Sequence, residues 1–211
     1  MINVNSASIL ALSLFLGTGI SFKDELKLIS PTSAVTTSAT IAGGTVIDDF
    51  TTPPYSWWVG SDEKYKYEID DNQELKVTIT NAGLVTGPGT GYDCFGKQFD
   101  PIDFTKTPVL KLKMKYTGAS APKVRIDVKD SEGNVSNAKS IVKKVENTDK
   151  FVEFYYDFTG RWTQSYPSAA TLDPVEIVEL LIFVNPGGPG WTGTLYLDDI
   201  QAVPVSELPK Q

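Results

Sequence analysis

The chain has 211 residues, enough for one large domain or two small ones. Its net charge of −7 argues against a nucleic-acid partner, which would require clustered Lys and Arg. The chain contains no His, which excludes Ser-His-Asp catalysis and every His-containing metal site. Cys94 is the only cysteine, so no internal disulfide can form, and we expect this side chain to be a small buried hydrophobe.

Residues 1–20 carry a short apolar run from Ile9 to Leu16. The run is far below the ~20 residues of a spanning helix, so we expect no membrane span. It is either an atypical signal peptide, because no Lys or Arg precedes it, or a retained segment that anchors the chain in a larger protein assembly. Residues 21–44 are rich in Ser and Thr and predict an extended linker, and the folded domain is expected over 45–205.

The folded part has the patterns of β-strands. Several segments alternate apolar and polar residues with period 2, which predicts antiparallel strands with one buried face. Strands are expected at 45–50, 64–69, 74–80, 109–117, 123–130, 150–158, 176–184 and 193–203. Residues 130–134, DSEGN, predict a turn, so the strand at 123–130 and the next one should form a hairpin. The fold class is therefore all-β, an antiparallel β-sandwich with an extended N-terminal segment.

Some of these segments also carry a family resemblance. IDDF near the start and GTLYLDDIQAV near the end are similar to the first and last strands of jelly-roll carbohydrate-binding modules. Between them, FDPIDFTKTPVLKLKMKY, KVRIDVKDSEGN, EFYYDFTGRW and LDPVEIVELLIFVNPGGPGWTG follow in the same order. The chain resembles families 11 and 30, whose sandwich is of the galactose-binding-domain type, from Thr45 to Pro204. This resemblance implies non-catalytic binding of a polysaccharide or surface glycan on a concave sheet face.

Aromatic residues in two segments are candidate carbohydrate-binding residues, because sugar rings stack on aromatic planes. The adjacent Trp57 and Trp58 cannot both face inward on a strand, so one should lie in the core and the other at the surface or a sheet edge. The segment 160–166 contains Arg161, Trp162 and Tyr166. The resemblance implies a cleft role for Arg161 and Tyr166, whereas Trp162 either contacts the ligand or covers the hydrophobic core.

Two other loops complete the candidate set. Tyr92 lies in GPGTGYDCF, a loop that reaches the cleft in the resembling modules. Trp191, in a Gly- and Pro-rich loop, is either a rim contact or a plug of that loop. Val184 stands where family 11 modules show an aromatic residue, so the chain departs from the family pattern there.

Two acidic pairs, Asp48-Asp49 and Asp198-Asp199, lie on the expected first and last strands. The resemblance implies that these strands are neighbours, which would bring like charges together unless a cation neutralises them. Calcium, with six to eight oxygen ligands, suits such a place, and the resembling families commonly hold a structural calcium ion there. The alternative is that these carboxylates are solvent-exposed strand ends.

The same residues give no enzymatic pattern. Glu176 and Glu179 are expected on opposite faces of one strand, which does not suit a glycosidase pair, and no nucleophile or nucleotide motif is present. We therefore expect a non-enzyme, a secreted or surface-displayed extracellular module that adheres to glycans. The alternative is a structural or adhesive component of a larger assembly, such as a virion decoration or fibre protein on a virion surface.

Overall fold

The computed structural model describes residues 40–41, 43–83, 93–136, 141–146, 150–162, 165–166 and 171–210. The predictions for residues 1–20, for most of the linker and for Tyr92 lie outside these residues. Strand β1 (Thr40–Ile41) lies near the end of the predicted linker and pairs with β2 (Gly44–Asp48). In the described residues, no helix is both long and apolar enough to cross a membrane.

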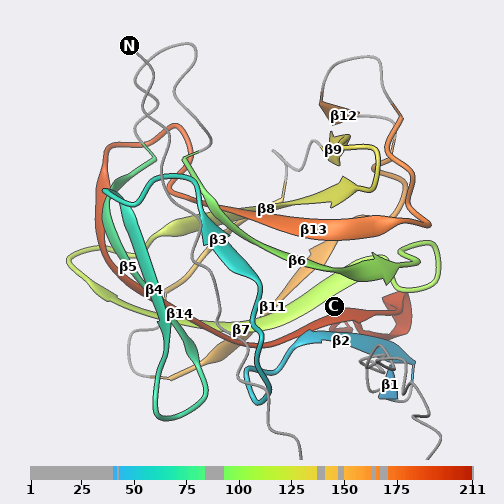
Figure 1. The fold of residues 1–211 in the computed structure, drawn as a ribbon, viewed down its shortest axis with the longest axis horizontal. Coiled ribbons are helices and arrows are strands. Elements are labelled where there is room, and N and C mark those ends of the chain that lie inside the picture. Colours follow the sequence, from blue (N-terminus) through green and yellow to red (C-terminus); the bar gives the residue numbers. More distant parts are fainter. Residues whose placement is uncertain are drawn as a thin grey trace, which may run out of the picture. The chain divides into compact units, whose positions relative to one another are not determined.

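The strands that the structure describes form two seven-stranded antiparallel sheets, one above the other in Figure 1. The first sheet contains β1, β2, β4 (Tyr65–Ile69), β5 (Leu75–Ala82), β7 (Val109–Gly118), β11 (Val152–Asp157) and β14 (Trp191–Val203). The second contains β3 (Trp57–Val59), β6 (Phe95–Ile102), β8 (Lys123–Asp130), β9 (Val135–Ser136), β10 (Val142–Lys144), β12 (Ser165–Tyr166) and β13 (Ile177–Val184). A short 3₁₀ turn, η1 (Val205–Glu207), follows the last strand.

The central strands hold each sheet together. In the first sheet, the 13-residue strand β14 pairs with β7, β5 and β2. In the second sheet the order is β12-β9-β8-β13-β6-β3, and β10 pairs with the same edge of β8 as β9 does, at the opposite end of that strand. All eight predicted strands are present, and the all-β sandwich is confirmed.

Two predictions about strand neighbours are also confirmed. The hairpin between β8 and β9 closes with the backbone N–H of Asp130 donating to the carbonyl of Asn134 at 3.0 Å. Gly133 has φ +90 in this turn, a left-handed conformation that suits glycine. The predicted first and last strands, β2 and β14, pair with each other, with Asp48 opposite Ile200.

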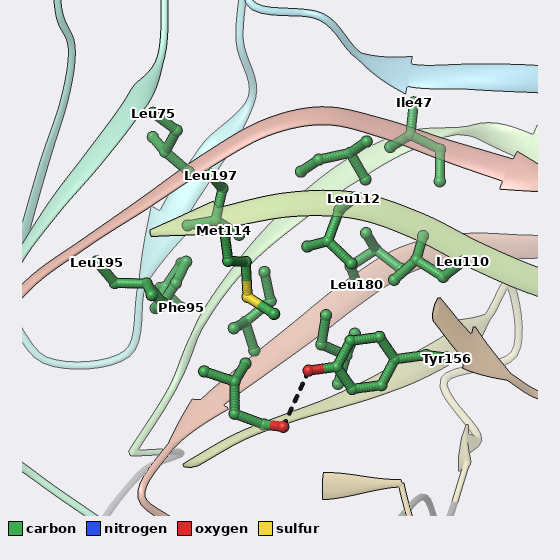
Figure 2. Close-up of a cluster of buried hydrophobic side chains, with 14 of the residues drawn as sticks. Ile47, Leu75, Phe95, Leu110, Leu112, Met114, Tyr156, Leu180, Leu195 and Leu197 are labelled. Atoms are coloured by element: carbon green, nitrogen blue, oxygen red, sulfur yellow. Dashed lines mark hydrogen bonds between the residues drawn. The ribbon is translucent and has the colours of Figure 1, made fainter. Parts of the chain in front are cut away.

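The hydrophobic core fills the space between the sheets. Alternate residues of β7, namely Leu110, Leu112 and Met114, are fully buried and face residues such as Phe95 and Leu180 of the second sheet (Figure 2). The Tyr156 hydroxyl crosses this core and donates to the Val124 carbonyl at 3.0 Å, which joins a first-sheet strand to a second-sheet strand (Figure 2). Each sheet therefore has one buried face and one outer face on which a ligand could lie.

Candidate functional site

The outer face of the second sheet combines an aromatic ring, ion pairs and a groove. We call it the Trp58 face and define it by Trp58, Gln98, Arg125, Lys129, Glu179 and Phe183. The strand register places these residues close together: Glu179 lies opposite Gln98 on β6 and Lys129 on β8, and Phe183 lies opposite Arg125. Side chains directly opposite each other on adjacent strands share a face of the sheet, so these residues form one surface.

Trp58 occupies the β3 edge of this face. It is half-buried and lies opposite Gly96 of β6. A Cβ atom at Gly96 would come within 2.6 Å of the Trp58 Cζ2 atom and 2.7 Å of its Cε2 atom, so the indole packs directly on the glycine. The indole is therefore in contact with β6 and is only partly covered. A flat aromatic surface of this kind can stack on the apolar C–H face of a sugar.

A β-bulge in β13 decides where Glu179 projects. Ile177 and Leu180 are both fully buried in the core although three positions separate them. The register shifts between Ile177 and Glu179 against both neighbouring strands: Val178 is the extra residue against β8, whereas against β6 the extra residues lie on β6 itself, between Gln98 and Ile102. As a result, Glu179 joins the outer face, whereas a regular alternation from Ile177 would turn it into the core.

Glu179 is the centre of the polar contacts on the Trp58 face. Its side chain is only 5% exposed. One carboxylate oxygen accepts the indole N–H of Trp58 at 2.7 Å, and the other accepts Lys129 Nζ at 2.7 Å. The amide of Gln98 lies 3.5 Å from the first oxygen. These charge-assisted bonds compensate the desolvation of the carboxylate.

A second ion pair lies further along the same face. Arg125 Nη2 donates to Asp127 Oδ2 at 3.0 Å, and the guanidinium carbon lies 4.2 Å from the ring centroid of Phe183. Strand β13 thus presents an aromatic residue on this face at Phe183. The neighbouring Val184, where family 11 modules show an aromatic residue, is fully buried in the core.

A groove of about 360 Å³ opens beside Glu179 at the end of β8. It is lined by Gln98, Phe99, Val178, Glu179 and the segment 129–133 of the β8–β9 hairpin. The groove thus combines amide, ammonium, carboxylate and backbone groups with the apolar side chains of Phe99 and Val178, a composition that suits hydroxyl-rich ligands.

Cys94 lies beneath the same face and is fully buried, as predicted. It clusters with Leu181 and Val135, and Trp58 and Phe183 pack against this cluster. Burial, with help from nearby carboxylates, raises the pKa of the thiol to about 12, so it stays protonated and acts as a packing residue.

Two of the predicted sugar-binding tryptophans lie in the core. Trp57 is 6% exposed, is stacked with Phe50 and donates its indole N–H to Asp48 at 3.0 Å. Trp191 is 3% exposed and donates to the Ser120 carbonyl at 2.8 Å. Of the adjacent pair Trp57 and Trp58, one is thus in the core and the other at the surface, as expected.

The segment after β11 packs largely against the core. Trp162 is half-buried, stacks with Phe158 at a centroid distance of 6.4 Å and meets Phe104 edge-on. This arrangement corresponds to a cover over the core. Arg161 is half-buried, and its Nε donates to the Asp157 carbonyl at 3.0 Å. Tyr166 lies on β12 opposite Val135, in the cross-strand row that also contains Lys129 and Glu179.

Lysines lie within ion-pair distance of three of the four aspartates predicted to bind calcium, namely Asp48, Asp198 and Asp199. Asp48 is buried and forms an ion pair with Lys97 at 2.8 Å, and Asp199 forms one with Lys113. Asp49 is exposed and accepts the Thr51 hydroxyl at 2.7 Å.

In the described part of the chain, no three Asp, Glu, His or Cys side chains are placed to hold a metal ion. Calcium binding stays a prediction from the family resemblance. Melting curves with and without EDTA test it, because an ion that binds only the native state raises Tm.

The fold is similar to that of solved carbohydrate-binding modules. One is the family 11 module of Clostridium thermocellum in complex with a β-1,3-1,4-mixed-linked tetrasaccharide: identity is 16%, the match covers 78% of this chain and 98% of the module, and the TM-score is 0.53. Another is the family 11 module of the cellulosomal cellulase Lic26A-Cel5E from Clostridium thermocellum, with 15% identity, coverage of 79% and 97%, and a TM-score of 0.51. No protein-family model matches the sequence, and no curated protein matches it. The chain has the jelly-roll fold of these modules.

The structure adds residues that sequence reasoning did not select. Arg125 and Lys129 were visible as alternate polar positions of a predicted strand, and this alternation could have marked them as surface partners. Gln98 lies on β6, which was not predicted as a strand. Glu179 was assigned to a face by simple alternation, a rule that the bulge in β13 interrupts.

Proposed function

We propose that this chain is a non-catalytic carbohydrate-binding module and that it binds a polysaccharide or surface glycan on the Trp58 face. The observation that carries the proposal is the half-buried Trp58 ring, which is seated on Gly96 beside a groove lined by polar groups. Stacking on such a ring removes apolar area from water at about 25 cal/mol per Å². The neighbouring polar side chains can donate to and accept from sugar hydroxyls without breaking any bond.

The similarity of fold supports the proposal, since the C. thermocellum family 11 module was solved with a mixed-linkage tetrasaccharide. The fold by itself hosts many functions, so the argument rests on the site. Affinity should be modest, because a half-buried aromatic ring and an open groove must also compensate for ordering the sugar chain. Because a polysaccharide of this kind is met outside the cell, we also propose an extracellular location.

Native gel electrophoresis through immobilised polysaccharides tests this function. Separate gels would contain mixed-linkage β-1,3-1,4-glucan, xylan, mannan or cell-surface glycans, and serum albumin would serve as the non-binding reference. We expect at least one polysaccharide to slow the protein relative to the reference. Migration that is unchanged in every gel would overturn the proposal. An assay for reducing ends on the retarding polysaccharide tests the non-catalytic part, and we expect no new ends.

A further inference from the structure

Glu179 combines two properties that rarely occur together. It lies on an outer sheet face, yet its side chain is 5% exposed. A carboxylate withdrawn from water destabilises the fold unless it is well bonded, and this one has Trp58, Lys129 and Gln98 as partners. The bulge at Val178 is what brings it to this face. Bulges of this kind re-aim side chains near functional sites.

The contacts of Trp58 show what Glu179 does. Gly96 sets the height of the ring above the sheet, because any larger residue there would collide with the indole. Packing on a glycine does not fix how the indole is rotated within its own plane. The hydrogen bond from the indole N–H to Glu179, at 2.7 Å, does fix it. Lys129 in turn holds the other carboxylate oxygen, so the acceptor itself cannot rotate.

We infer, on the basis of the proposed function, that Glu179 is a positioning residue, which fixes the Trp58 ring in the orientation that stacks on a sugar. It acts through Trp58, and its contribution is pre-organisation: a ring that is already held loses less entropy when the ligand binds. The ligand class is a sugar that presents a flat apolar C–H face to this ring.

Two substitutions separate the hydrogen bond from the charge. Glu179→Leu removes the acceptor, and Glu179→Gln keeps an acceptor oxygen but removes the charge. The leucine variant is expected to fold, because the Lys129 side chain is 34% exposed, so its ammonium can turn to solvent and is not left as a buried unpaired charge. The matched control is Glu74→Leu, which removes a carboxylate paired with Lys115 at 2.8 Å on the opposite sheet.

The first readout needs no sugar. In ¹H–¹⁵N spectra the indole N–H signal of Trp58 is assigned by its loss in Trp58→Phe. We expect Glu179→Leu to shift this signal upfield and speed its exchange with solvent, with little change in Glu179→Gln or Glu74→Leu. An unchanged Trp58 signal in a folded Glu179→Leu variant would overturn the inference, whether or not the protein binds sugar.

The second readout is binding to the polysaccharide that retards the wild type most. We expect Glu179→Leu to bind about tenfold more weakly, a loss of about 1.4 kcal/mol, and Glu179→Gln to recover most of the affinity. Equal affinity of Glu179→Leu and the wild type would also overturn the inference. If the wild type binds no polysaccharide, the proposed function fails, and the Trp58 signal still decides whether Glu179 positions the ring.

Discussion

Both outer faces of the sandwich carry a cation over an aromatic ring, as Arg125 over Phe183 shows on the second sheet, but Trp58 has its polar partner in a different place. On the first sheet, Lys115 lies 4.9 Å from the ring centroid of Tyr196, and Lys111 lies 5.8 Å from that of Tyr155. On the second sheet, Glu179 bonds Trp58 through its indole N–H, at the edge of the ring. An ammonium group over a ring occupies the surface on which a sugar would stack, whereas a bond at the edge leaves that surface available.

The ion-paired side chains on the two faces also differ in how far they are exposed to solvent. We call the outer face of the first sheet the Lys113 face and define it by Glu74, Lys111, Lys113, Lys115, Tyr155 and Tyr196. Its lysines alternate along β7, and their ion pairs are partly exposed, such as that of Lys111 with Glu153 at 3.3 Å. On the Trp58 face, by contrast, Glu179 is nearly buried. The comparison suggests that the Lys113 face is a solvated surface and the Trp58 face a pre-organised one.

Replacing one aromatic residue on each face by alanine should give the largest difference between the faces, measured as retention by the polysaccharide. Trp58→Ala removes the stacking surface, and we expect retention by the polysaccharide to be lost. Tyr196→Ala removes a ring that already contacts Lys115, and we expect retention to be unchanged. Affinity electrophoresis of both variants measures this, with melting curves to show that each is folded. If only Tyr196→Ala loses retention, the binding surface lies on the first sheet, which would contradict the proposal.

Removing one lysine from each face should separate them in stability. Lys129→Ala leaves the nearly buried Glu179 without its ammonium partner, and we expect a loss of about 2 kcal/mol in the free energy of unfolding. Lys113→Ala removes a partly exposed pair, for which we expect about 0–1 kcal/mol. Urea denaturation of the two variants measures both values. Equal losses would show that the two faces do not differ in the burial of their charges.

The smallest effect should come from the pH dependence of Asp198. Burial, together with the neighbouring Asp199, raises the pKa of Asp198 above its usual value. The folded chain therefore holds this proton more tightly than the unfolded chain, so its stabilising contribution is present at low pH and is lost as pH rises through the folded pKa. We expect Asp198→Asn to raise Tm slightly at pH 7 and to leave it unchanged at pH 3. A lower Tm at pH 7 would contradict the direction of the pKa shift.

Sequence alone could predict the fold because alternation is a local signal. Leu110, Leu112 and Met114 alternate with lysines, and the structure places them in the core. The strands that position the site carry weaker signals. Strand β3 has three residues, and β6 contains a glycine, a proline and several polar residues.

The site itself could be predicted only in part. Trp58 was selected because two adjacent tryptophans must face opposite sides of a strand, which is a rule of geometry. Trp191 was selected because it lies in a Gly- and Pro-rich loop, but it begins β14 and is buried. Whether a tryptophan is core or surface depends on contacts from distant strands, which no local pattern contains. The bulge that presents Glu179 depends in the same way on the registers of two neighbouring strands.

The most direct measurement is a ¹H–¹⁵N titration of the protein with mixed-linkage β-1,3-1,4-glucan oligosaccharides, or with whichever polysaccharide fragment the gels identify. The account predicts that the shifting signals include the Trp58 indole and the amides of Gln98, Lys129 and Glu179, while those of Lys113 and Tyr196 stay in place. Signals that shift on the Lys113 face and not on the Trp58 face would contradict the account.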